Sequence, residues 1–535
     1  MQFSPLFASP YGPISEAQAP QTASNSLSIP SQAPSGAAVV AKDLISLSIE
    51  FRHLPKFTGN ISHPNYFSRN LLQNLKDATG SFPLVRVGGS SQDDAFYNST
   101  QKEAEVDLPT PPDAQYPPAS CGASFFDSYT LWPDVQFTAG INLASNDSES
   151  LEKFTELSCK ALGSRLVMWE VGNEPDFYEN FKRRKPGTWN IDDYVETWQG
   201  HSAAVQEQAA KTCPSLADTG FYGPSIGTVS SSPDSFTDVA AFAKGINKNS
   251  KTQIKQISTH SYMGIADSNT SPSILQRNLM NHTAVMHHIG NYVSLRSALS
   301  KYGDLPFTIG EGNSLAGGGA GGISDTFGAA LWVVDYALYI ASVGIKRVHF
   351  HQSDSAPYNA WIPGHGSELP VKTCAPYYGK LLAARLIGIE DGIQVINPDI
   401  PGTDGLESMY VAYDSSGPKR IAILNMKQWN SVDTGTRPTR KYTVELPADG
   451  NWNVSAHWLQ AKGAELKDGI TFGGDSYDFD ADHGKPAVAK DDVKAADTGV
   501  TIDGNKLTVE LDDSEGVLLD LTDGGGYIAK TPSTT

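Results

Sequence analysis

Short apolar segments recur from residue 45 onward, and longer stretches with apolar residues at helical spacing lie between them. The short segments are nearly all apolar rather than alternating, which is typical of parallel strands buried on both faces. We expect strands at 45–51, 84–88, 136–143, 166–171, 220–223, 254–259, 307–310 and 347–350.

The stretches between these strands predict helices. We expect them at 66–78, 149–162, 192–211, 236–246, 274–302 and 326–343. Eight strands that are each followed by a helix, within about 350 residues, indicate a (β/α)₈ TIM barrel with long loops. A doubly wound sheet is the alternative, but no Gly-x-Gly-x-x-Gly fingerprint follows the first strand.

The pattern changes after residue 389, where short alternating runs are separated by Asp-Gly and Gly-Asn turn signals. This predicts an antiparallel β-sandwich that packs on the barrel as a structural accessory, with carbohydrate binding as the alternative role. The division is then 1–44 as a linker or edge strand, 45–390 as the barrel and 391–535 as the sandwich. Its strands are expected at 409–412, 420–424, 442–445, 455–458, 500–502, 506–510 and 517–521.

Composition excludes several classes of function. The 535 residues include 40 Lys and Arg against 59 Asp and Glu, a formal net charge of −19. Proteins that bind nucleic acid or strongly polyanionic substrates normally carry a basic surface, so we expect neither as a partner. No apolar run approaches the roughly 20 residues of a membrane-spanning helix, and we expect no membrane association.

Two glutamates stand at strand ends where a barrel keeps its catalytic groups. Glu174 lies in the segment 168–175 (MWEVGNEP), at the end of the fourth strand, and Pro175 stops the strand directly after it. Glu311 lies in 307–314 (FTIGEGNS), at the end of the seventh strand, between two glycines. Strands four and seven are on opposite sides of a barrel mouth, so the two carboxylates can face each other across a bound sugar.

Such a pair suits glycoside hydrolysis. Carboxyl groups about 5–5.5 Å apart support the retaining mechanism, and a wider separation supports inversion. One carboxylate must be ionised to attack the anomeric carbon while the other is protonated, and the charge on one raises the pKa of the other. A single strand-end glutamate more often caps an amide or pairs with arginine, but two in these positions favour catalysis.

Four segments resemble glycoside hydrolase family 79, the β-glucuronidase and heparanase family of clan A. They are Asn-Glu-Pro at 173–175, the segment 310–319 (GEGNSLAGGG), the first strand 45–51 (ISLSIEF) and the second strand 85–90 (VRVGGS). The glycine run after Glu311 is the more specific signal. The resemblance covers the barrel and the trailing β-domain.

The resemblance implies roles for individual residues. Glu174 would be the acid/base and Glu311 the nucleophile, and Asn173 would hold the sugar 2-hydroxyl group. In the segment 259–262 (THSY), Tyr262 matches a clan tyrosine that orients the nucleophile and keeps it ionised. His260, two residues earlier, is read either as part of the site or as a structural histidine.

Recognition of a uronate needs donors for its carboxylate. The resemblance assigns this task to the glycine loop, with Gly317 and Gly318 turning backbone N–H groups toward the anion, and to a tyrosine after strand eight, for which Tyr358 is the candidate. A merely flexible loop is the alternative. Glu50 and Ser90, at the ends of strands one and two, are placed to bind sugar hydroxyl groups, although Glu50 could instead pair with Arg52 or Arg86.

Cysteines and sequons bear on the cellular compartment. Cys159 and Cys213 fall near the ends of neighbouring predicted helices and are expected to form a disulfide, and Cys121 and Cys374 could form a second. Six Asn-x-Ser/Thr sequons favour a secreted glycoprotein, although residues 1–10 show no evident secretory signal. The basic run 182–185 (KRRK) is either a solvated face or a contact for an acidic polysaccharide, and 286–288 (MHH) is expected on a helix surface.

These observations favour a retaining exo-β-glucuronidase that removes terminal glucuronic acid, or its 4-O-methyl form, from a glycoside or plant polysaccharide. No metal and no organic cofactor is implied. The alternatives are a heparanase-like endo-β-glucuronidase, a clan relative that acts on neutral sugars, and a non-catalytic sugar-binding barrel. The charge of −19 disfavours a sulfated heparan substrate.

Overall fold

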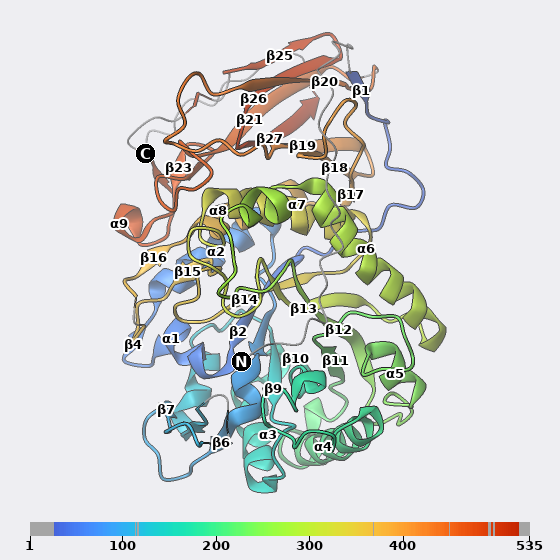
Figure 1. Cartoon of the computed structure of the whole chain (residues 1–535), viewed down its shortest axis with the longest axis vertical. Coiled ribbons are helices and arrows are strands. Elements are labelled where there is room, and N and C mark those ends of the chain that lie inside the picture. The colour runs from blue at the N-terminus through green and yellow to red at the C-terminus, as the bar shows by residue number, and fades with distance from the viewer. Residues whose placement is uncertain are drawn as a thin grey trace.

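The computed structural model describes residues 26–112, 114, 117–367, 369–448, 450–489, 494–495 and 498–523, so residues 1–10, in which no secretory signal is evident, lie outside it. Figure 1 shows a barrel with its helices in the lower part of the view and stacked sheets above it. The helices α7 (Phe327–Ser342) and α8 (Ala375–Ile387) lie between the two parts. None of the described helices is long and apolar enough to cross a lipid bilayer.

Eight parallel strands close into a barrel, which confirms the predicted fold class. Around the barrel the order is β10-β11-β12-β13-β14-β2-β5-β9. The strands are β2 (Ile45–Glu50), β5 (Val85–Gly88), β9 (Phe137–Ile141), β10 (Leu166–Val171), β11 (Phe221–Ile226), β12 (Ile254–Tyr262), β13 (Phe307–Asn313) and β14 (Val348–Gln352).

Helices follow seven of these eight strands within the described part of the chain. They are α1 (Leu54–Thr58) and α2 (Tyr66–Thr79), α3 (Ser148–Leu162), α4 (Ile191–Thr212), α5 (Asp238–Ala243), α6 (His282–Leu299), α7 and α8. The expectation of a helix after every strand is wrong for the second strand. The described residues between β5 and β9 hold instead β6 (Ala95–Tyr97), β7 (Glu105–Asp107), β8 (Ala119–Cys121) and the 3₁₀ helix η3 (Ala123–Thr130).

The barrel strands are apolar on one face only. Val85 and Val87 of β5 pack in the apolar core, whereas Arg86 between them is fully buried and bonds to residues of three other strands inside the barrel. On β14, Val348 and Phe350 pack outward and His349 alternates with them. The strands are therefore buried on both faces, as expected, but the inner face is polar and hydrogen-bonded.

The C-terminal part consists of two antiparallel sheets with one parallel edge pair. The larger has the order β17 (Gln394–Ile396), β18 (Glu407–Asp414), β19 (Gly417–Asn425), β27 (Glu515–Asp523), β21 (Trp452–Gln460), β22 (Thr471–Phe472), β23 (Asp475–Ser476) and β24 (Ala487–Val488). The smaller has the order β1 (Ser26–Ser28), β20 (Thr439–Glu445), β26 (Lys506–Asp512) and β25 (Val500–Asp503). The remaining strands of the described chain are β3 (Gly59–Asn60), β4 (His63–Pro64), β15 (Trp361–Ile362) and β16 (Lys372–Thr373), and its last α-helix is α9 (Phe479–Asp482).

The larger sheet is buried on both faces. Along β18, Met409 and Val411 belong to the core between the two sheets, while Tyr410 and Ala412 belong to the core shared with the barrel helices. The helix α8 contacts four strands of this sheet, and Tyr410 donates a 2.7 Å hydrogen bond to Asp335 of α7. The β-domain therefore stabilises the barrel wall behind β13 and β14.

The N-terminal segment contributes an edge strand. The strand β1 pairs in parallel with β20 of the smaller sheet, and Val39 forms an isolated antiparallel bridge with Gln394 of β17. The segment before the barrel thus runs along the β-domain, as Figure 1 shows, before the chain enters β2.

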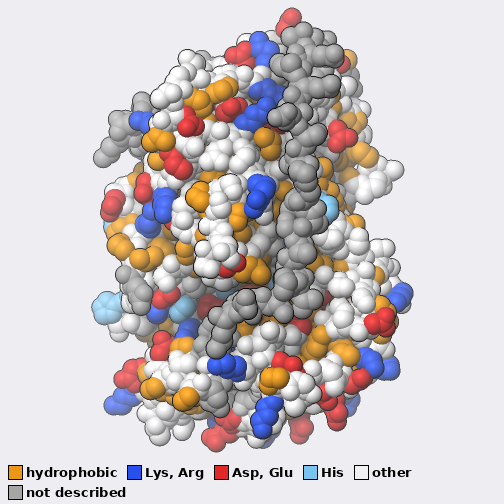
Figure 2. All heavy atoms as spheres, viewed as in Figure 1, with side chains coloured by type: hydrophobic (Ala, Val, Ile, Leu, Met, Phe, Trp, Pro, Cys, Tyr) orange, Lys and Arg blue, Asp and Glu red, His pale blue; other side chains and the backbone are white. Residues whose placement is uncertain are grey.

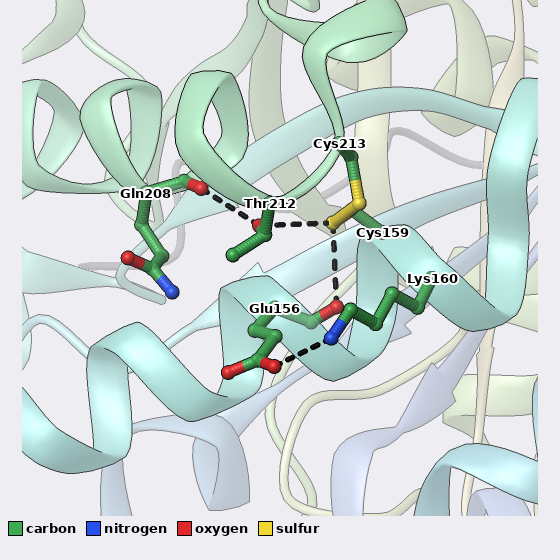
Figure 3. The surroundings of a disulfide bond; sticks show 6 residues. All are labelled: Glu156, Cys159, Lys160, Gln208, Thr212 and Cys213. Carbon is green, nitrogen blue, oxygen red and sulfur yellow. Dashed lines mark hydrogen bonds and ion pairs between the residues drawn. A yellow bond between two sulfur atoms is a disulfide. The ribbon is translucent and has the colours of Figure 1, made fainter.

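One of the two expected disulfides is present. Cys159 of α3 and Cys213 at the end of α4 are bonded, with their Cα atoms 6.3 Å apart, and Figure 3 shows the bond joining the two helices. The second pairing is wrong, because Cys121 and Cys374 are both free and buried. Cys121 lies in the sheet of β6, β7 and β8, and Cys374 is the residue directly before α8. Both were expected in loops on the same face of the barrel, but these positions do not bring the two sulfur atoms together.

Candidate active site

Strands β10 and β13 bring the two predicted glutamates together. Oxygen atoms of Glu174 and Glu311 and a ring nitrogen of His260 all lie within 4.8 Å of one another. Both carboxylates are withdrawn from solvent, with exposed side-chain fractions of 13% for Glu174 and 7% for Glu311. Their separation matches the short distance that retaining glycosidases use.

A β-bulge turns Glu311 into the barrel. The register between β12 and β13 shifts after Ile309, so Thr259 pairs with Ile309 but His260 pairs with Glu311. The extra residue is Gly310, where a Cβ atom would collide with the hydroxyl of Ser258. Without the bulge Glu311 would face the helices, as Ile309 does, so the glycine before the glutamate directs its side chain.

The backbone of Glu174 has a left-handed conformation, with φ of 48°. Residues with a Cβ atom seldom adopt this region, and such residues concentrate at functional sites. The N–H of Glu174 donates to the carbonyl of Ser225 at 2.9 Å, and Pro175 begins a 3₁₀ turn, η5 (Pro175–Phe177), directly afterwards. These neighbours fix the position of the carboxylate at the end of β10.

Glu311 is surrounded by donors and cations. The hydroxyl of Tyr262 donates to Oε1 at 2.7 Å, and Nη1 of Arg86 donates to Oε2 at 2.5 Å. Nδ1 of His351 lies 3.4 Å from the same Oε2. Burial raises the pKa of Glu311, but the charges of His351, His260 and Arg86 and the Tyr262 hydroxyl outweigh it and hold that pKa well below its usual range. Glu311 is therefore ionised.

Arg86 connects the floor of the site. Besides Glu311, its guanidinium donates to Glu170 Oε2 at 2.6 Å, to Ser48 Oγ at 2.9 Å and to Asn173 Oδ1 at 2.7 Å. A Cβ atom on Gly88 would lie 2.5 Å from the guanidinium carbon. The glycine two residues after the arginine therefore makes the room in which this side chain folds.

Asn173 has one donor left for a ligand. Its backbone N–H donates to Asp93 at 2.8 Å, and its Oδ1 accepts from Arg86. Its Nδ2 is buried and has no hydrogen-bond partner in the described part of the chain. Because an unpartnered buried donor is unfavourable, this N–H group suits a bound hydroxyl.

The surroundings of Glu174 are sparser. Nδ1 of His260 lies 2.9 Å from Oε1 of Glu174 and 3.8 Å from Oε1 of Glu311. When Glu174 is a carboxylate, which can only accept, the ring nitrogen carries the proton of the shorter contact. His260 therefore lies between the two carboxylates.

Glu50 lies in the site, but its partners differ from those expected. The basic side chain near it is His351, whose Nε2 is 3.2 Å away, rather than Arg52 or Arg86. The N–H and the hydroxyl of Ser91 donate to its Oε1 at 2.8 and 2.5 Å. Burial raises the pKa of Glu50, but its contacts with His351 and Ser91 outweigh burial and lower it to about 2.

Ser90 stands beside this group, and its carbonyl accepts from Arg183 at 2.7 Å. It is the next residue, Ser91, whose hydroxyl contacts Glu50. Between the strand and these serines, Gly89 has φ of 88° and leaves no room for a Cβ atom beside the Glu50 carboxylate.

The glycine loop lies beside Tyr358. Gly317, Gly318 and Gly319 have φ of 81°, 94° and 82°, a conformation that favours glycine. A Cβ atom on Gly319 would lie 3.1 Å from the ring of the buried Tyr358, and the rings of Tyr262 and Tyr358 are 6.4 Å apart. No hydrogen bond within the described chain uses the N–H groups of these three glycines.

The same carboxylates could also reach a metal ion, since Glu174, His260 and Glu311 offer three ligand atoms within 4.8 Å. However, both oxygens of Glu311 already accept hydrogen bonds, and the guanidinium of Arg86 is in contact with it. A fixed positive charge beside the carboxylate opposes binding of a second cation. The donor set fits an anionic nucleophile better than a metal centre.

Comparison with known proteins identifies the family. The model of the glycosyl hydrolase family 79 C-terminal beta domain matches residues 409–518. A β-glucuronidase of Aspergillus niger is 36% identical over 521 residues, which cover 93% of this chain and 94% of that protein. A β-glucuronidase of Neurospora crassa is 34% identical over 504 residues, covering 86% and 88%. The chain belongs to glycosyl hydrolase family 79. The resemblance inferred from the sequence is confirmed, and the chain is a glycoside hydrolase.

Solved structures share the fold of this family 79 chain. A 4-O-α-L-rhamnosyl-β-D-glucuronidase from Fusarium oxysporum 12S superposes with a TM-score of 0.73 at 22% identity, covering 92% of this chain and 100% of that chain. A family 51 α-L-arabinofuranosidase from Bifidobacterium longum gives 0.61 at 12% identity, covering 94% and 100%. The barrel with its β-domain is thus shared well beyond recognisable sequence similarity.

Two further expectations for this family 79 chain were wrong in part. Within the basic run, Lys182 and Lys185 are exposed, but Arg183 and Arg184 turn inward, Arg183 to Asp94 at 2.5 Å and Arg184 to the carbonyl of Ala144 at 2.7 Å. Figure 2 shows acidic side chains interspersed with basic ones over the described part of the face that it presents. His288, expected on a helix surface, instead bonds to Ser261 Oγ at 2.9 Å.

Sequence reasoning missed three residues as members of the site. Arg86 and Glu170 each stand alone as the charged side chain within a segment of apolar neighbours, and His351 alternates with apolar residues as His349 does. A charge at such a position is buried, and a buried charge needs a partner of opposite sign. This signal was present in the segments 85–88, 166–171 and 348–351 and could have identified all three.

Proposed function

We propose that this chain is a retaining β-glucuronidase that removes terminal β-D-glucuronic acid by double displacement. The observation that carries the proposal is the pair Glu174 and Glu311, with oxygens within 4.8 Å of each other and in different surroundings. The named β-glucuronidases that match over most of the chain support the substrate class.

In the first step, the ionised Glu311 attacks the anomeric carbon while Glu174 donates a proton to the leaving oxygen. The Tyr262 hydroxyl and the Arg86 guanidinium hold the Glu311 carboxylate in place. Nδ2 of Asn173 is placed for the sugar 2-hydroxyl, a contact that strengthens in the transition state.

In the second step, the ester on Glu311 no longer carries a charge. Glu174, which gave up its proton in the first step, is then a carboxylate beside a neutral ester and accepts a proton from the attacking water. His260, in contact with Oε1 of Glu174, stabilises the carboxylate that each cycle regenerates.

The uronate would be recognised by the loop with Gly317 and Gly318 together with Tyr358. The N–H groups of this loop are available as donors for an anion, and the Tyr358 hydroxyl supplies a neutral donor, since burial raises its pKa well above the usual value. Glu50 and Ser90 would contact sugar hydroxyl groups, or a 4-O-methyl group in the methylated sugar.

Action at a chain end is favoured by the side of the site opposite Glu174. There, Lys56 pairs with Asp354 at 2.5 Å and so joins the chain after β2 to the chain after β14. This ion pair would close the non-reducing end of the site and admit a single terminal sugar. A heparanase-like enzyme would instead need a groove open on both sides.

Paired substrates test the proposal. We expect hydrolysis of 4-nitrophenyl β-D-glucuronide with a kcat/KM at least 100-fold above that for the β-D-glucoside, because a missing carboxylate leaves the donors of the glycine loop unpaired. Proton NMR of the first product should give the β-anomer. Preference for the glucoside, a first product with the α-configuration, or internal fragments from a polysaccharide would each contradict the corresponding part of the proposal.

We also propose that the protein is extracellular. The Cys159–Cys213 disulfide supports an oxidising compartment, where such bonds persist. Expression in a fungal host, followed by treatment of the medium with peptide N-glycosidase, should release a protein of lower mass if the sequons are occupied. Retention inside the cell without glycans would contradict this assignment.

A further inference from the structure

The ring of Phe177 lies directly beside the proposed acid/base. A Cβ atom built on Gly227 would be 2.5 Å from Cε2 of Phe177 and 3.1 Å from Oε1 of Glu174. The ring edge and the carboxylate oxygen therefore both border the space that the missing side chain of Gly227 leaves open. The general acid must contact the oxygen that carries the aglycone, so an aglycone has to pass this ring.

Asp176 holds in place the turn that carries Phe177. Its two oxygens accept from the backbone N–H groups of Gly227 at 3.0 Å and Thr228 at 2.9 Å. This ties the turn after β10 to the turn after β11. Burial raises the pKa of Asp176 to about 6, so near pH 7 most of this group is a carboxylate. A negative charge beside the acid/base disfavours an anionic aglycone.

A second ring extends the surface away from Glu174. The rings of Phe177 and Phe181 meet edge to face with centroids 5.8 Å apart, and both side chains are partly exposed. The guanidinium of Arg183 lies 5.2 Å above the Phe181 ring. Its charge is matched by Asp94, and the Ser90 carbonyl accepts a further hydrogen bond from it. Arg183 therefore braces the ring pair and offers little net charge to a ligand.

We propose that Phe177 and Phe181 form an aglycone subsite for a flat, uncharged group, either an aryl ring or the apolar face of an unsulfated sugar. The assignment rests on the proposed glucuronidase activity. Aromatic rings stack on aryl groups and bury the C–H face of pyranoses. The carboxylate of Asp176 and the inward-turned Arg183 exclude sulfated aglycones from the same surface.

The experiment measures kcat and KM for wild type, Phe177→Ala and Phe181→Ala on three substrates. They are 4-nitrophenyl β-D-glucuronide, a glucuronosyl-galactose disaccharide and β-D-glucuronosyl fluoride, whose leaving group is too small to touch the rings. Phe82→Ala is the matched control, because Phe82 is half-buried and precedes β5 at the opposite end of the barrel. Melting temperatures of all variants identify any that fold poorly.

We expect each variant at Phe177 or Phe181 to lose about tenfold in kcat/KM on at least one of the two larger substrates, the scale of one aromatic contact. Turnover of the fluoride should stay unchanged, as should all activities of Phe82→Ala. A loss confined to the aryl glucuronide assigns the subsite to aryl groups, and a loss confined to the disaccharide assigns it to sugars.

Parallel losses on the fluoride and the larger substrates would overturn the subsite, because Phe177 would then only support Glu174. Unchanged kinetics on all substrates in both variants would overturn it as well. Failure of the wild-type protein to hydrolyse any glucuronide, including the fluoride, would instead contradict the proposed function itself, so the two failures are distinguishable.

Discussion

The two carboxylates that we propose as catalytic lie at the same end of the barrel but in very different surroundings. Glu311 accepts from a tyrosine and an arginine, and His351 is close to the same oxygen as the arginine. Glu174 has one close histidine, and the ring of Phe177 borders the same space beside Gly227. In the proposed mechanism these two identical side chains have opposite roles, because more groups stabilise the charge of Glu311 than that of Glu174.

This difference follows from how each glutamate is delivered. A bulge turns Glu311 into the polar interior of the barrel. There, Arg86 donates hydrogen bonds to Glu170 and Asn173. Glu174 lies at the rim, beyond the end of β10, and its own backbone has a left-handed conformation. Depth in the barrel therefore separates the proposed nucleophile from the proposed acid/base.

The largest effect should follow removal of the deeper carboxylate. Glu311→Ala should lower kcat by roughly 10⁵–10⁶-fold on every glucuronide, since no covalent intermediate can form. Azide should restore turnover and yield the α-glucuronosyl azide. The measurement is steady-state hydrolysis with product NMR, and retained activity on any substrate would contradict the assignment.

Glu174→Ala should separate substrates by their leaving groups. We expect a loss of about 10²–10⁴-fold for glucuronides with poor leaving groups, because general acid catalysis is missing. Glucuronosyl fluoride, whose leaving group needs no proton, should still form the intermediate rapidly, and azide should now yield the β-azide. Equal losses on both substrate types would erase the distinction between the two carboxylates.

Tyr262→Phe should weaken Glu311 without removing it. The lost hydrogen bond to a charged group corresponds to about 10–100-fold in kcat. The hydroxyl lowers the pKa of Glu311, so its removal raises that pKa, and the acidic limb of the kcat/KM profile should move to higher pH. A profile that keeps its acidic limb would show that Tyr262 does not act through Glu311.

Glu50→Gln should change stability in a defined pH window. The pKa of Glu50 is lowered to about 2, so this contact stabilises the fold above its ordinary value of 4.5 and is lost as the pH falls toward 2. Burial lowers the pKa of His351, but Glu311 and Glu50 outweigh it and raise that pKa above 6.5, so the His351 contribution is present below 6.5 and lost at higher pH. The difference in melting temperature from wild type should peak between pH 4.5 and 6.5.

Loss of the disulfide should destabilise the fold without changing the proposed roles of the two carboxylates. Cys159→Ser combined with Cys213→Ser should lower the free energy of unfolding by about 2–4 kcal/mol, since the bond closes a long loop between α3 and α4. Urea unfolding measures this loss, while kcat on all substrates should be unchanged. A fall in kcat would mean that the helices position the site.

Much of the fold could be predicted from local patterns. All eight barrel strands were placed by their apolar runs, because each strand has one face against the helices. The prediction of a helix between β5 and β9 was wrong, since the rigidity of this connection comes from the small sheet of β6, β7 and β8 rather than from a periodic helix. No residue range could be given for α8, because this helix is buried on nearly all sides, between barrel and β-domain, and shows no polar face.

The site was predictable where a motif marks a strand end. Glu174, Glu311, Asn173 and Tyr262 were placed by the ends of three strands. The hydrogen-bond network around these residues could not be predicted, because Arg86 reaches Glu170 and Glu311 across the barrel, and such pairings depend on closure of the sheet. The basic run 182–185 likewise gave no hint that its two arginines would turn inward.

The most direct test of the account is to trap the covalent intermediate. Incubation with 2-deoxy-2-fluoro-β-D-glucuronosyl fluoride slows the second step and should leave the enzyme esterified. Peptide mass mapping should then find the fluoro-glucuronosyl group on Glu311. A label on Glu174, or loss of the inhibitor's fluoride without any labelled peptide, would contradict the division of roles between the two carboxylates.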